Sequence, residues 1–285
     1  METFVLLALN GLIWGLIIAL IALGLSIIFG LLDVINLAHG DFFMVGSVLA
    51  WFVLQTTGNF WIALLIVPLI GFVMGSICEY LVIRPIKNAA ALTIVATFGL
   101  SLFLQEGVRA TFGASPKRLV VPVDQTFSLL GIEYEVYRLL AALFAILIIS
   151  GFFIFLHKTK IGIWMRAVRF NPEIATAMGI PTKKIYLFTF AIGFAMAAQG
   201  GVVAAPITTV DFQSGVDILP FCFMAVIIGG LGNLEGTVAA AIILSVFEGM
   251  VTSFADPTLA RISSLSLMCI ILILKPHGIF SGAKS

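Results

Sequence analysis

Side chains capable of metal binding or covalent catalysis are few in this chain, and they are not grouped. Three histidines and three cysteines are scattered along it: His39, His157, His277, Cys78, Cys222 and Cys269. No cluster of His, Asp and Glu has the spacing of a metal site or a catalytic triad. The phosphate-binding pattern Gly-x-x-x-x-Gly-Lys-Ser/Thr is absent too. The sequence therefore predicts no enzymatic, metal or nucleotide site, and the cysteines are expected to be small core residues.

Two glycine-containing segments instead offer polar side chains that can hydrogen-bond a solute. Residues 33–46 hold polar side chains beside Gly40, and residues 229–236 hold Asn233 among glycines. Each contains Asn-Leu followed shortly by Gly, which hints at an internal repeat. Paired glycine-interrupted segments in an apolar chain are typical of a transport pathway. The candidate pathway residues are Asn36, His39, Gly40, Asp41, Gly230 and Asn233. For His39 and Asp41 the alternative is a surface turn in which a side chain caps the next helix.

The composition shows what must surround these segments. The 285 residues are 61% hydrophobic and 10% charged, with a mean hydropathy of +1.19, whereas a soluble domain carries about 25% charged residues. No water-soluble fold can bury so much apolar surface, so the chain is predicted to be an integral membrane protein. The first ~30 residues lack a basic start and a small-residue cleavage site, and they are expected to remain as a membrane span.

Apolar runs of about 20 residues, the length that crosses a bilayer, divide the chain into helices. Residues 3–32 contain no charge, and residues 42–78 form two spans because Thr56-Thr57-Gly58-Asn59 interrupts them. Further uncharged runs lie at 88–105, 139–156, 185–210, 218–234, 236–247 and 262–274. The predicted fold class is an all-α membrane protein of about nine transmembrane helices, with eight or ten as alternatives.

The distribution of Lys and Arg predicts the orientation of these spans. With alternating loops, ten of the 15 basic residues fall on one side: Arg84, Lys87, Lys158, Lys160, Arg166, Arg169, Lys183, Lys184, Lys275 and Lys284. The other side receives Arg109, Lys117, Arg118, Arg138 and Arg261. Because cytoplasmic loops carry the excess of basic residues, the loop at about 157–184 and the C-terminus are expected in the cytoplasm. The N-terminus and a long loop at about 109–138 are expected outside.

The cytoplasmic loop contains the signals of a short separate helix. Asn171 is a good N-cap, Pro172 suits the first helical position, and Glu173 places a carboxylate at the positive end of the helix dipole. Gly179 can adopt the left-handed conformation that ends a helix. The predicted helix, 172–178, is too short to be stable alone in water, so it must dock on another surface.

The pattern Glu173-x-Ala175-x-x-x-Gly179 in this helix resembles the coupling loop of ABC importer permeases. The resemblance implies that the helix sits in a cleft of an ATPase subunit, whose closure on ATP is transmitted to the membrane spans. It assigns ATPase coupling to Arg166, Asn171, Pro172, Glu173, Ala175 and Gly179. An ordinary capped helix between two spans is the alternative.

Four motifs in register extend the resemblance over nearly the whole chain. They are Asn36-Leu-Ala-His-Gly-Asp41, Thr97-Phe-Gly-Leu-Ser-Leu-Phe-Leu-Gln105, Asn171-Pro-Glu-Ile-Ala-Thr-Ala-Met-Gly-Ile180 and Gly229-Gly-Leu-Gly-Asn-Leu-Glu-Gly236. All four are similar to motifs of branched-chain amino-acid ABC transporter permeases, H-type subunit. The chain departs from the usual residues at Leu37, Asp41, Asn233 and Lys275, and these departures bear on the substrate.

Similarity to that family implies a single transmembrane permease domain, 1–285, that imports branched-chain or other neutral amino acids. It implies two ABC ATPase subunits that hold ATP and Mg²⁺, an external substrate-binding protein, and a second, M-type permease, with a homodimer as the alternative. The chain itself is expected to hold no cofactor or metal and to bind no nucleic acid. Its expected location is the lipid bilayer of a bacterial or archaeal cytoplasmic membrane.

The alternatives to amino-acid import are import of another solute, a different class of transporter and a membrane enzyme. Permeases for urea and short amides share the same signatures, so the same machinery could import those solutes. A secondary transporter or channel would need ion-coupling carboxylates inside its spans, but the span centres are uncharged. A membrane-embedded enzyme has little support because the catalytic side chains are scattered.

Overall fold

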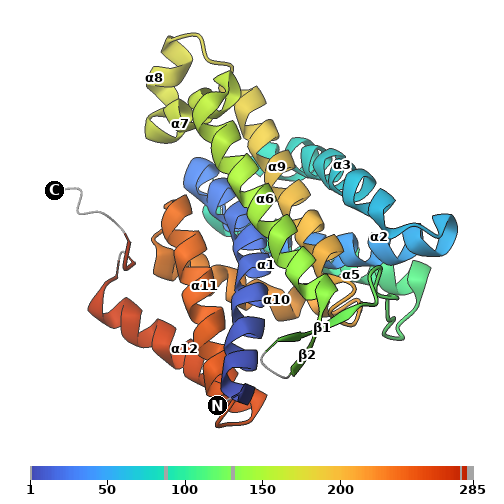
Figure 1. Ribbon diagram of the computed structural model, residues 1–285. Coiled ribbons are helices and arrows are strands. Elements are labelled where there is room, and N and C mark those ends of the chain that lie inside the picture. Colours follow the sequence, from blue (N-terminus) through green and yellow to red (C-terminus); the bar gives the residue numbers. More distant parts are fainter. Residues whose placement is uncertain (1, 87–88, 130–131, 277, 281–285) are drawn as a thin grey trace.

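The computed structural model describes residues 2–86, 89–129, 132–276 and 278–280, most of which are helical (Figure 1). The first half contains α1 (Glu2–Leu32), α2 (His39–Thr57), α3 (Phe60–Cys78), the π-helix η1 (Glu79–Ile83), α4 (Arg84–Ile86) and α5 (Ala90–Phe112). A hairpin follows, made of β1 (Thr126–Leu129) and β2 (Ile132–Glu135). The second half contains α6 (Val136–Lys158), α7 (Lys160–Phe170), α8 (Pro172–Ala177), α9 (Thr182–Ala204), α10 (Ser214–Gly229), α11 (Leu234–Val251) and α12 (Pro257–Leu274).

Each apolar run of the sequence corresponds to one long helix: α1, α2, α3, α5, α6, α9, α10, α11 and α12. Among the described residues, seven helices are long and apolar enough to cross a membrane, and one of them joins α3, η1 and α4. α2 is not among the seven, and α10 is shorter, with 16 residues. The all-α membrane fold is confirmed, whereas nine crossings stay a prediction.

α1 is the central helix of the bundle, and its residues from Ile17 to Leu25 are almost completely buried. Small residues let neighbouring helices approach it closely. A Cβ atom added at Gly15 would lie 2.9 Å from Cα of Ile242 in α11. In lipid, such close backbone packing drives helix association, because apolar side chains gain little by leaving lipid for one another.

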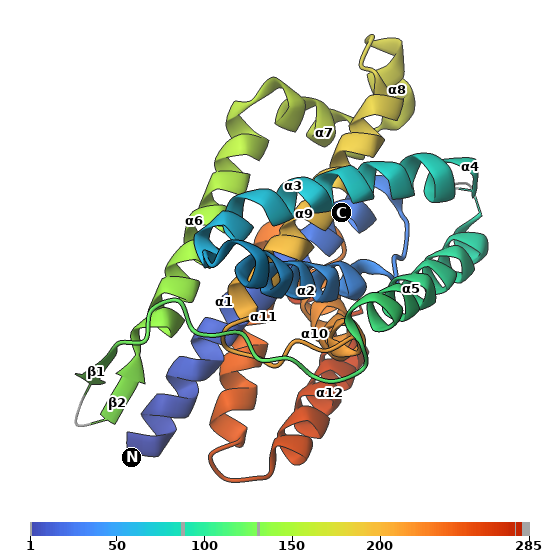
Figure 2. The same ribbon diagram turned by 90° about the vertical axis from the view of Figure 1, so that its right-hand side faces the viewer.

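The bundle has two different ends (Figures 1 and 2). We call them the α8 end, where α7 and α8 lie, and the hairpin end, where β1 and β2 lie beside the start of α1. The hydroxyl group of Tyr134 in β2 donates a hydrogen bond to Oδ1 of Asn10 in α1 over 2.7 Å. The predicted loop at about 109–138 is therefore partly regular, since α5 continues to Phe112 and the two strands occupy much of its second half.

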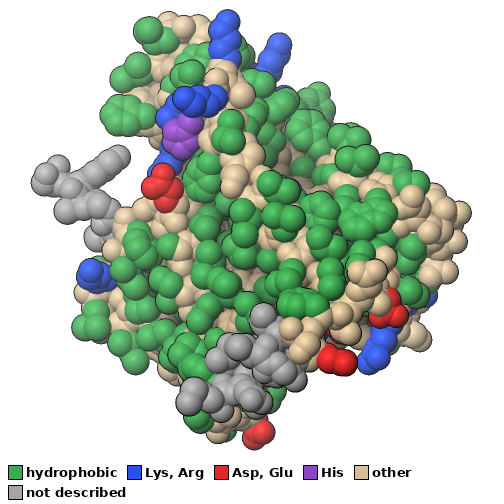
Figure 3. Space-filling model, viewed as in Figure 1, with side chains coloured by type: hydrophobic (Ala, Val, Ile, Leu, Met, Phe, Trp, Pro, Cys, Tyr) green, Lys and Arg blue, Asp and Glu red, His purple; other side chains and the backbone are tan. Residues whose placement is uncertain are grey.

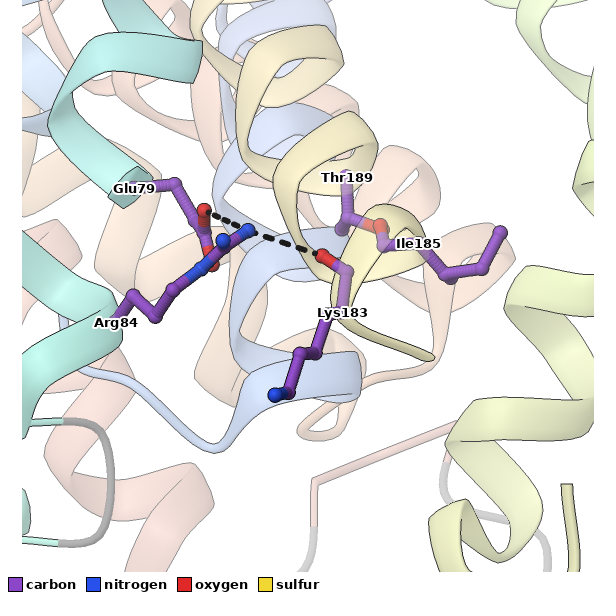
Figure 4. Close-up of polar contacts among 5 residues, drawn as sticks. All are labelled: Glu79, Arg84, Lys183, Ile185 and Thr189. Atoms are coloured by element: carbon purple, nitrogen blue, oxygen red, sulfur yellow. Dashed lines mark hydrogen bonds and ion pairs between the residues drawn. The ribbon is translucent and has the colours of Figure 1, made fainter. Parts of the chain in front are cut away.

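An ion pair between η1 and α4, at the α8 end, is linked by a hydrogen bond to the first turn of α9 (Figure 4). Nη2 of Arg84 lies 3.0 Å from Oε2 of Glu79, whose side chain is 2% exposed. The same Nη2 donates to the backbone oxygen of Lys183 over 3.3 Å. Because Lys183 follows α8 closely in the chain, this pair ties the end of the 157–184 loop to the bundle.

Candidate functional site

The chain between α1 and α2 turns back into the bundle. α1 ends at Leu32, at the α8 end, but α2 begins at His39, whose Nε2 donates to the backbone oxygen of Ile21 over 2.9 Å. Ile21 lies three turns before Leu32, about 16 Å along the helix. We call residues 33–41 the mid-bundle turn, because they lie level with the middle of α1.

Contacts with α5 and α9 place the mid-bundle turn at the same depth. The hydroxyl group of Thr97, in α5, accepts a hydrogen bond from the backbone N–H of Leu37 over 3.2 Å. The ring of Phe42 stacks on that of Phe194, in α9, with centroids 3.6 Å apart. Thr97 and Phe194 both lie in the central turns of their helices. Irregular backbone is tolerated inside a membrane only where protein or water surrounds it, and here α5 helps to satisfy it.

The polar side chains of the mid-bundle turn are enclosed by these helices. Asn36, His39 and Asp41 are 0%, 0% and 1% exposed. Asp41 accepts a hydrogen bond from Nε2 of Gln105 over 3.0 Å, and the same nitrogen lies 2.9 Å from Oγ of Ser101. Among the described residues, Nδ2 of Asn36 and Nδ1 of His39 have no hydrogen-bond partner.

The surface-turn alternative for His39 and Asp41 is therefore wrong. Both side chains are buried, and the residue that caps α2 is Ala38, without a side-chain hydrogen bond. Oδ1 of Asn36 shapes the turn instead, by accepting the backbone N–H of Ala38 over 3.1 Å. In the sequence these residues follow the first membrane span directly. The sequence does not show that the chain turns back into the bundle at this point.

The first turns of α2 and α10 meet at Asp41. Gly40 touches the backbone of Gly215, and a Cβ atom added at Gly215 would lie 2.8 Å from Oδ1 of Asp41. Glycine at these two positions is required by the close approach of the two backbones. Because the start of a helix is the positive end of its dipole, the carboxylate of Asp41 lies where two positive ends converge.

A second candidate region is the coupling arm, residues 159–181, which contains α7 and α8. α8 begins as predicted: Oδ1 of Asn171 accepts the backbone N–H groups of Glu173 and Ile174 over 3.0 and 2.9 Å. Pro172 occupies the first turn, where its missing N–H costs nothing. The helix ends at Ala177, one residue before the predicted end.

The C-terminus of α8 is closed by two backbone hydrogen bonds. The N–H of Gly179 donates to the oxygen of Thr176, and the N–H of Ile180 donates to the oxygen of Ala175. This pair of bonds requires a left-handed residue after the helix, and Gly179 has φ +81°. The predicted roles of Asn171 and Gly179 as caps are confirmed.

α7 was not predicted from the sequence. It is an amphipathic helix that buries Gly162, Met165 and Val168. The apolar spacing of these residues, close to one helical turn, was the signal that could have revealed it. Arg166 and Arg169 are exposed and one turn apart, so they project from the same side of α7.

Large apolar side chains of the coupling arm are exposed. Phe170, Ile174 and Met178 are 84%, 59% and 79% exposed, whereas Ala175 is 4% exposed and packs inward. Figure 3 shows basic side chains gathered around this end of the molecule, above a broad apolar surface on the bundle. An exposed apolar group on a polar, basic projection marks an interaction surface.

The turn between α10 and α11, residues 230–233, lies beneath the coupling arm. Asn233 caps α11: its Oδ1 accepts the backbone N–H of Gly236 over 3.0 Å, and its Nδ2 donates to the oxygen of Phe280 over 2.7 Å. Gly230 has φ +95° and packs against Gly278. Gly230 and Asn233, the two candidate pathway residues of this segment, therefore shape the turn.

Arg169 connects the coupling arm to the α10–α11 turn, although it was not among the predicted site residues. Its Nη2 would lie 3.0 Å from a Cβ atom added at Gly232, and its Nε would lie 3.7 Å from one added at Gly30. Partial burial lowers the pKa of Arg169, but a guanidinium remains charged in proteins. One side chain thus touches α1 and the α10–α11 turn.

The six candidate pathway residues are not brought together. Those of the mid-bundle turn lie level with Ile21 and Gly24 of α1, whereas the α10–α11 turn lies against Gly30. Gly24 and Gly30 are about 9 Å apart along the helix. The polar partners of the mid-bundle turn, Thr97, Ser101 and Gln105, were not predicted. Their four-residue spacing, which puts them on one face of α5, was the available signal.

Residues 7–274 match the family model described as branched-chain amino acid transport system / permease component. The chain is 27% identical over 293 residues to the high-affinity branched-chain amino acid transport system permease protein LivH of Escherichia coli (strain K12), which covers 95% of this chain and 93% of that protein. No solved structure matches the chain.

Two archaeal relatives come from Methanocaldococcus jannaschii. The probable branched-chain amino acid transport permease protein LivH is 27% identical over 286 residues, 95% of this chain and 90% of its own length. The probable LivM permease is 25% identical over 243 residues, 76% of this chain and 67% of its own length. The family match includes the mid-bundle turn, the coupling arm and the α10–α11 turn. This chain therefore belongs to the family of permease components of branched-chain amino acid transport systems.

Proposed function

We propose that the chain is the translocating subunit of an ATP-driven importer of branched-chain or other neutral amino acids. The observation that carries the proposal is the coupling arm. Its short helix α8 is capped at both ends, but six residues do not form a stable helix alone in water. The exposed side chains of Phe170, Ile174 and Met178 give the coupling arm an apolar surface on which a partner can dock. In an ABC importer, that partner is an ATPase subunit.

The α8 end then faces the cytoplasm and the hairpin end faces outward. The positive-inside rule supports this orientation, although Lys87 and Lys284, which contribute to the charge bias, lie outside the described residues. Two ATPase subunits hold ATP and Mg²⁺ beneath the coupling arms, and an external binding protein delivers the substrate. Similarity to both LivH and LivM relatives favours a second, related permease as the partner chain, with a homodimer as the alternative.

The mid-bundle turn is the part of this chain that best fits the substrate pathway. It places irregular backbone, a carboxylate and unpartnered polar atoms of Asn36 and His39 inside the bundle. Buried polar atoms without a partner are costly, and water or a passing zwitterion would satisfy them. An aliphatic amino acid needs few polar contacts, because most of its surface is apolar.

Purification of the tagged chain from its native host in mild detergent tests the assembly. We expect two ATPase subunits and a second polytopic chain to be recovered with it. Recovery of the chain alone would contradict the importer assignment and favour a secondary transporter or channel. Uptake of labelled leucine, alanine and urea by the recovered complex then identifies the class of solute, and transport of urea alone would support the amide alternative.

Substitutions in α8 test the coupling assignment. Glu173→Lys replaces a carboxylate that favours the helix start with a cation that opposes it, and we expect loss of ATP-driven uptake with normal membrane insertion. Gly179→Pro should have the same effect, because proline cannot adopt φ +81°. Glu133→Lys, on the exposed surface of the hairpin, is the matched control. Normal uptake in both α8 variants would remove the coupling role.

A further inference from the structure

A cavity of about 530 Å³ lies between the coupling arm and the bundle. Four segments line it: the last turns of α1, the last turns of α6, α7, and the α10–α11 turn with the first residues of α11. It is separate from the mid-bundle turn, which lies further along α1 toward the hairpin end. Its volume is within the usual range of small-molecule sites, about 300–1,000 Å³.

Charges of opposite sign line different walls of this cavity. Arg166 and Arg169 come from α7, and Glu235 comes from the first turn of α11. Among the described residues, none of the three forms an ion pair, whereas Glu79, Glu106 and Glu135 are each paired with an arginine. In Figure 3, basic and acidic side chains lie near each other where the α7–α8 projection meets the bundle.

The other polar side chains of the lining each form at least one hydrogen bond within the protein. Oδ1 and Nδ2 of Asn233 both form hydrogen bonds within the protein, and Nδ1 of His157 donates a hydrogen bond to the backbone oxygen of Phe153. The rest of the wall is largely apolar: Ile27, Leu31, Phe153, Leu156, Met165 and Leu234. A ligand that fits this lining carries an anionic group, a cationic group and an aliphatic body.

We propose that this cavity binds a zwitterionic α-amino acid with an aliphatic side chain, entering from the α8 side. The carboxylate meets Arg166 and Arg169, whose planar donors suit it, the ammonium group meets Glu235, and the side chain packs on the apolar wall. That the ligand is the imported amino acid itself rests on the proposed function.

Occupancy of the cavity has a consequence for coupling. A bound amino acid bridges α7 to the start of α11, so it stabilises one position of the coupling arm against the bundle. A ligand that binds one conformation better shifts the equilibrium toward it. Amino acid accumulated on the cytoplasmic side therefore slows further uptake, which makes the cavity a product-feedback site.

Binding of labelled leucine to the purified complex in nanodiscs, without ATP or binding protein, tests the site directly. We expect saturable binding that Glu235→Gln weakens about tenfold, through loss of one charge-assisted contact. Ile27→Trp, which fills the cavity, should abolish it. Glu133→Gln is the matched control, and thermal unfolding checks that each variant is folded. Leucine binding that is absent, or unchanged in both cavity variants, would overturn the proposal.

Uptake into proteoliposomes separates this proposal from the function on which it rests. With ATP inside and loaded binding protein outside, internal unlabelled leucine should slow uptake by the wild type but not by Glu235→Gln. Absence of uptake even without internal leucine would contradict the proposed function instead. An aminophospholipid has similar charges, so its recovery from the wild type, with no leucine binding after its removal, would also overturn the proposal.

Discussion

The guanidinium group of Arg169 lies against the backbone of Gly232, so closely that a Cβ atom at residue 232 would be 3.0 Å from Nη2. Gly30 of α1 belongs to the same contact, because a Cβ atom there would lie 2.9 Å from Cα of Gly232. The coupling arm, the central helix and the α10–α11 turn therefore meet at one point. We propose that a movement of α8, carried by α7, reaches the bundle through this contact.

Gly232→Ala should disturb this contact. Residue 232 has φ +79°, so alanine introduces backbone strain of about 1–3 kcal/mol and pushes Arg169 away. Gly58→Ala is the matched control, because Gly58 has φ +68° but no neighbour within 4 Å of an added Cβ. We expect similar losses of stability in thermal unfolding but a loss of uptake only in Gly232→Ala. Equal uptake by the two variants would show that this contact does not transmit movement.

Arg169→Ala should separate ATP hydrolysis from uptake. Removal of the side chain breaks the contact between arm and bundle but leaves α8 and its surface intact. We expect ATP hydrolysis to continue while uptake per ATP falls about tenfold. A factor of that size is typical of the coupling between two sites of a protein. Arg169→Lys should restore only part of it, because lysine lacks the planar group that lies on the glycines.

Lys183→Ala is the control for this prediction. It removes a basic, exposed side chain from the same end of the molecule, and the backbone oxygen of Lys183 keeps its bond to Arg84. Uptake per ATP should stay near the wild-type value. If Lys183→Ala and Arg169→Ala lower the ratio equally, the effect comes from net charge, and the contact with Gly232 has no special role.

Asn171→Ala removes the cap at the start of α8. Its Oδ1 satisfies two backbone N–H groups, and loss of such a cap costs about 1 kcal/mol. We expect weaker association with the ATPase subunit and lower uptake, and Asn171→Asp should recover most of both, because aspartate is an equally good cap. Association is measured by co-purification at increasing detergent concentration. Failure of Asn171→Asp to recover function would indicate a direct contact of the amide instead.

The features that follow from local chemistry could be read from the sequence. The apolar runs predict the long helices, and Asn171, Pro172 and Gly179 predict both ends of α8 because caps depend on neighbouring residues alone. The position of the mid-bundle turn depends instead on contacts with distant residues: His39 with Ile21, and Leu37 with Thr97. A linear pattern does not contain those pairings.

The contact of Arg169 with the α10–α11 turn could not be predicted from the sequence, for a related reason. Its partners, Gly30 and Gly232, are far away in sequence and have no side chains that would identify them as partners. The helix that presents Arg169 was missed as well, because α7 is short and its charges resemble those of an ordinary basic loop. The candidate pathway residues were predicted as one set because the two segments share an Asn-Leu pattern. The structure places the two segments at different depths along α1, and the pattern does not contain that information.

Asp41→Asn tests whether the mid-bundle turn takes part in transport. Asparagine keeps the shape of the side chain and an oxygen that can accept from Gln105, but it removes the charge from the point where α2 and α10 begin. Loss of that charge should lower stability by about 0.5–2 kcal/mol, which chemical unfolding in detergent can measure. We also expect uptake to fall about tenfold, because the carboxylate would meet the ammonium group of the substrate. Assembly and basal ATP hydrolysis should be retained. Glu106→Gln, in an exposed ion pair of the same helix as Gln105, should transport normally. Wild-type uptake by Asp41→Asn would mean that Asp41 only stabilises the two helix starts.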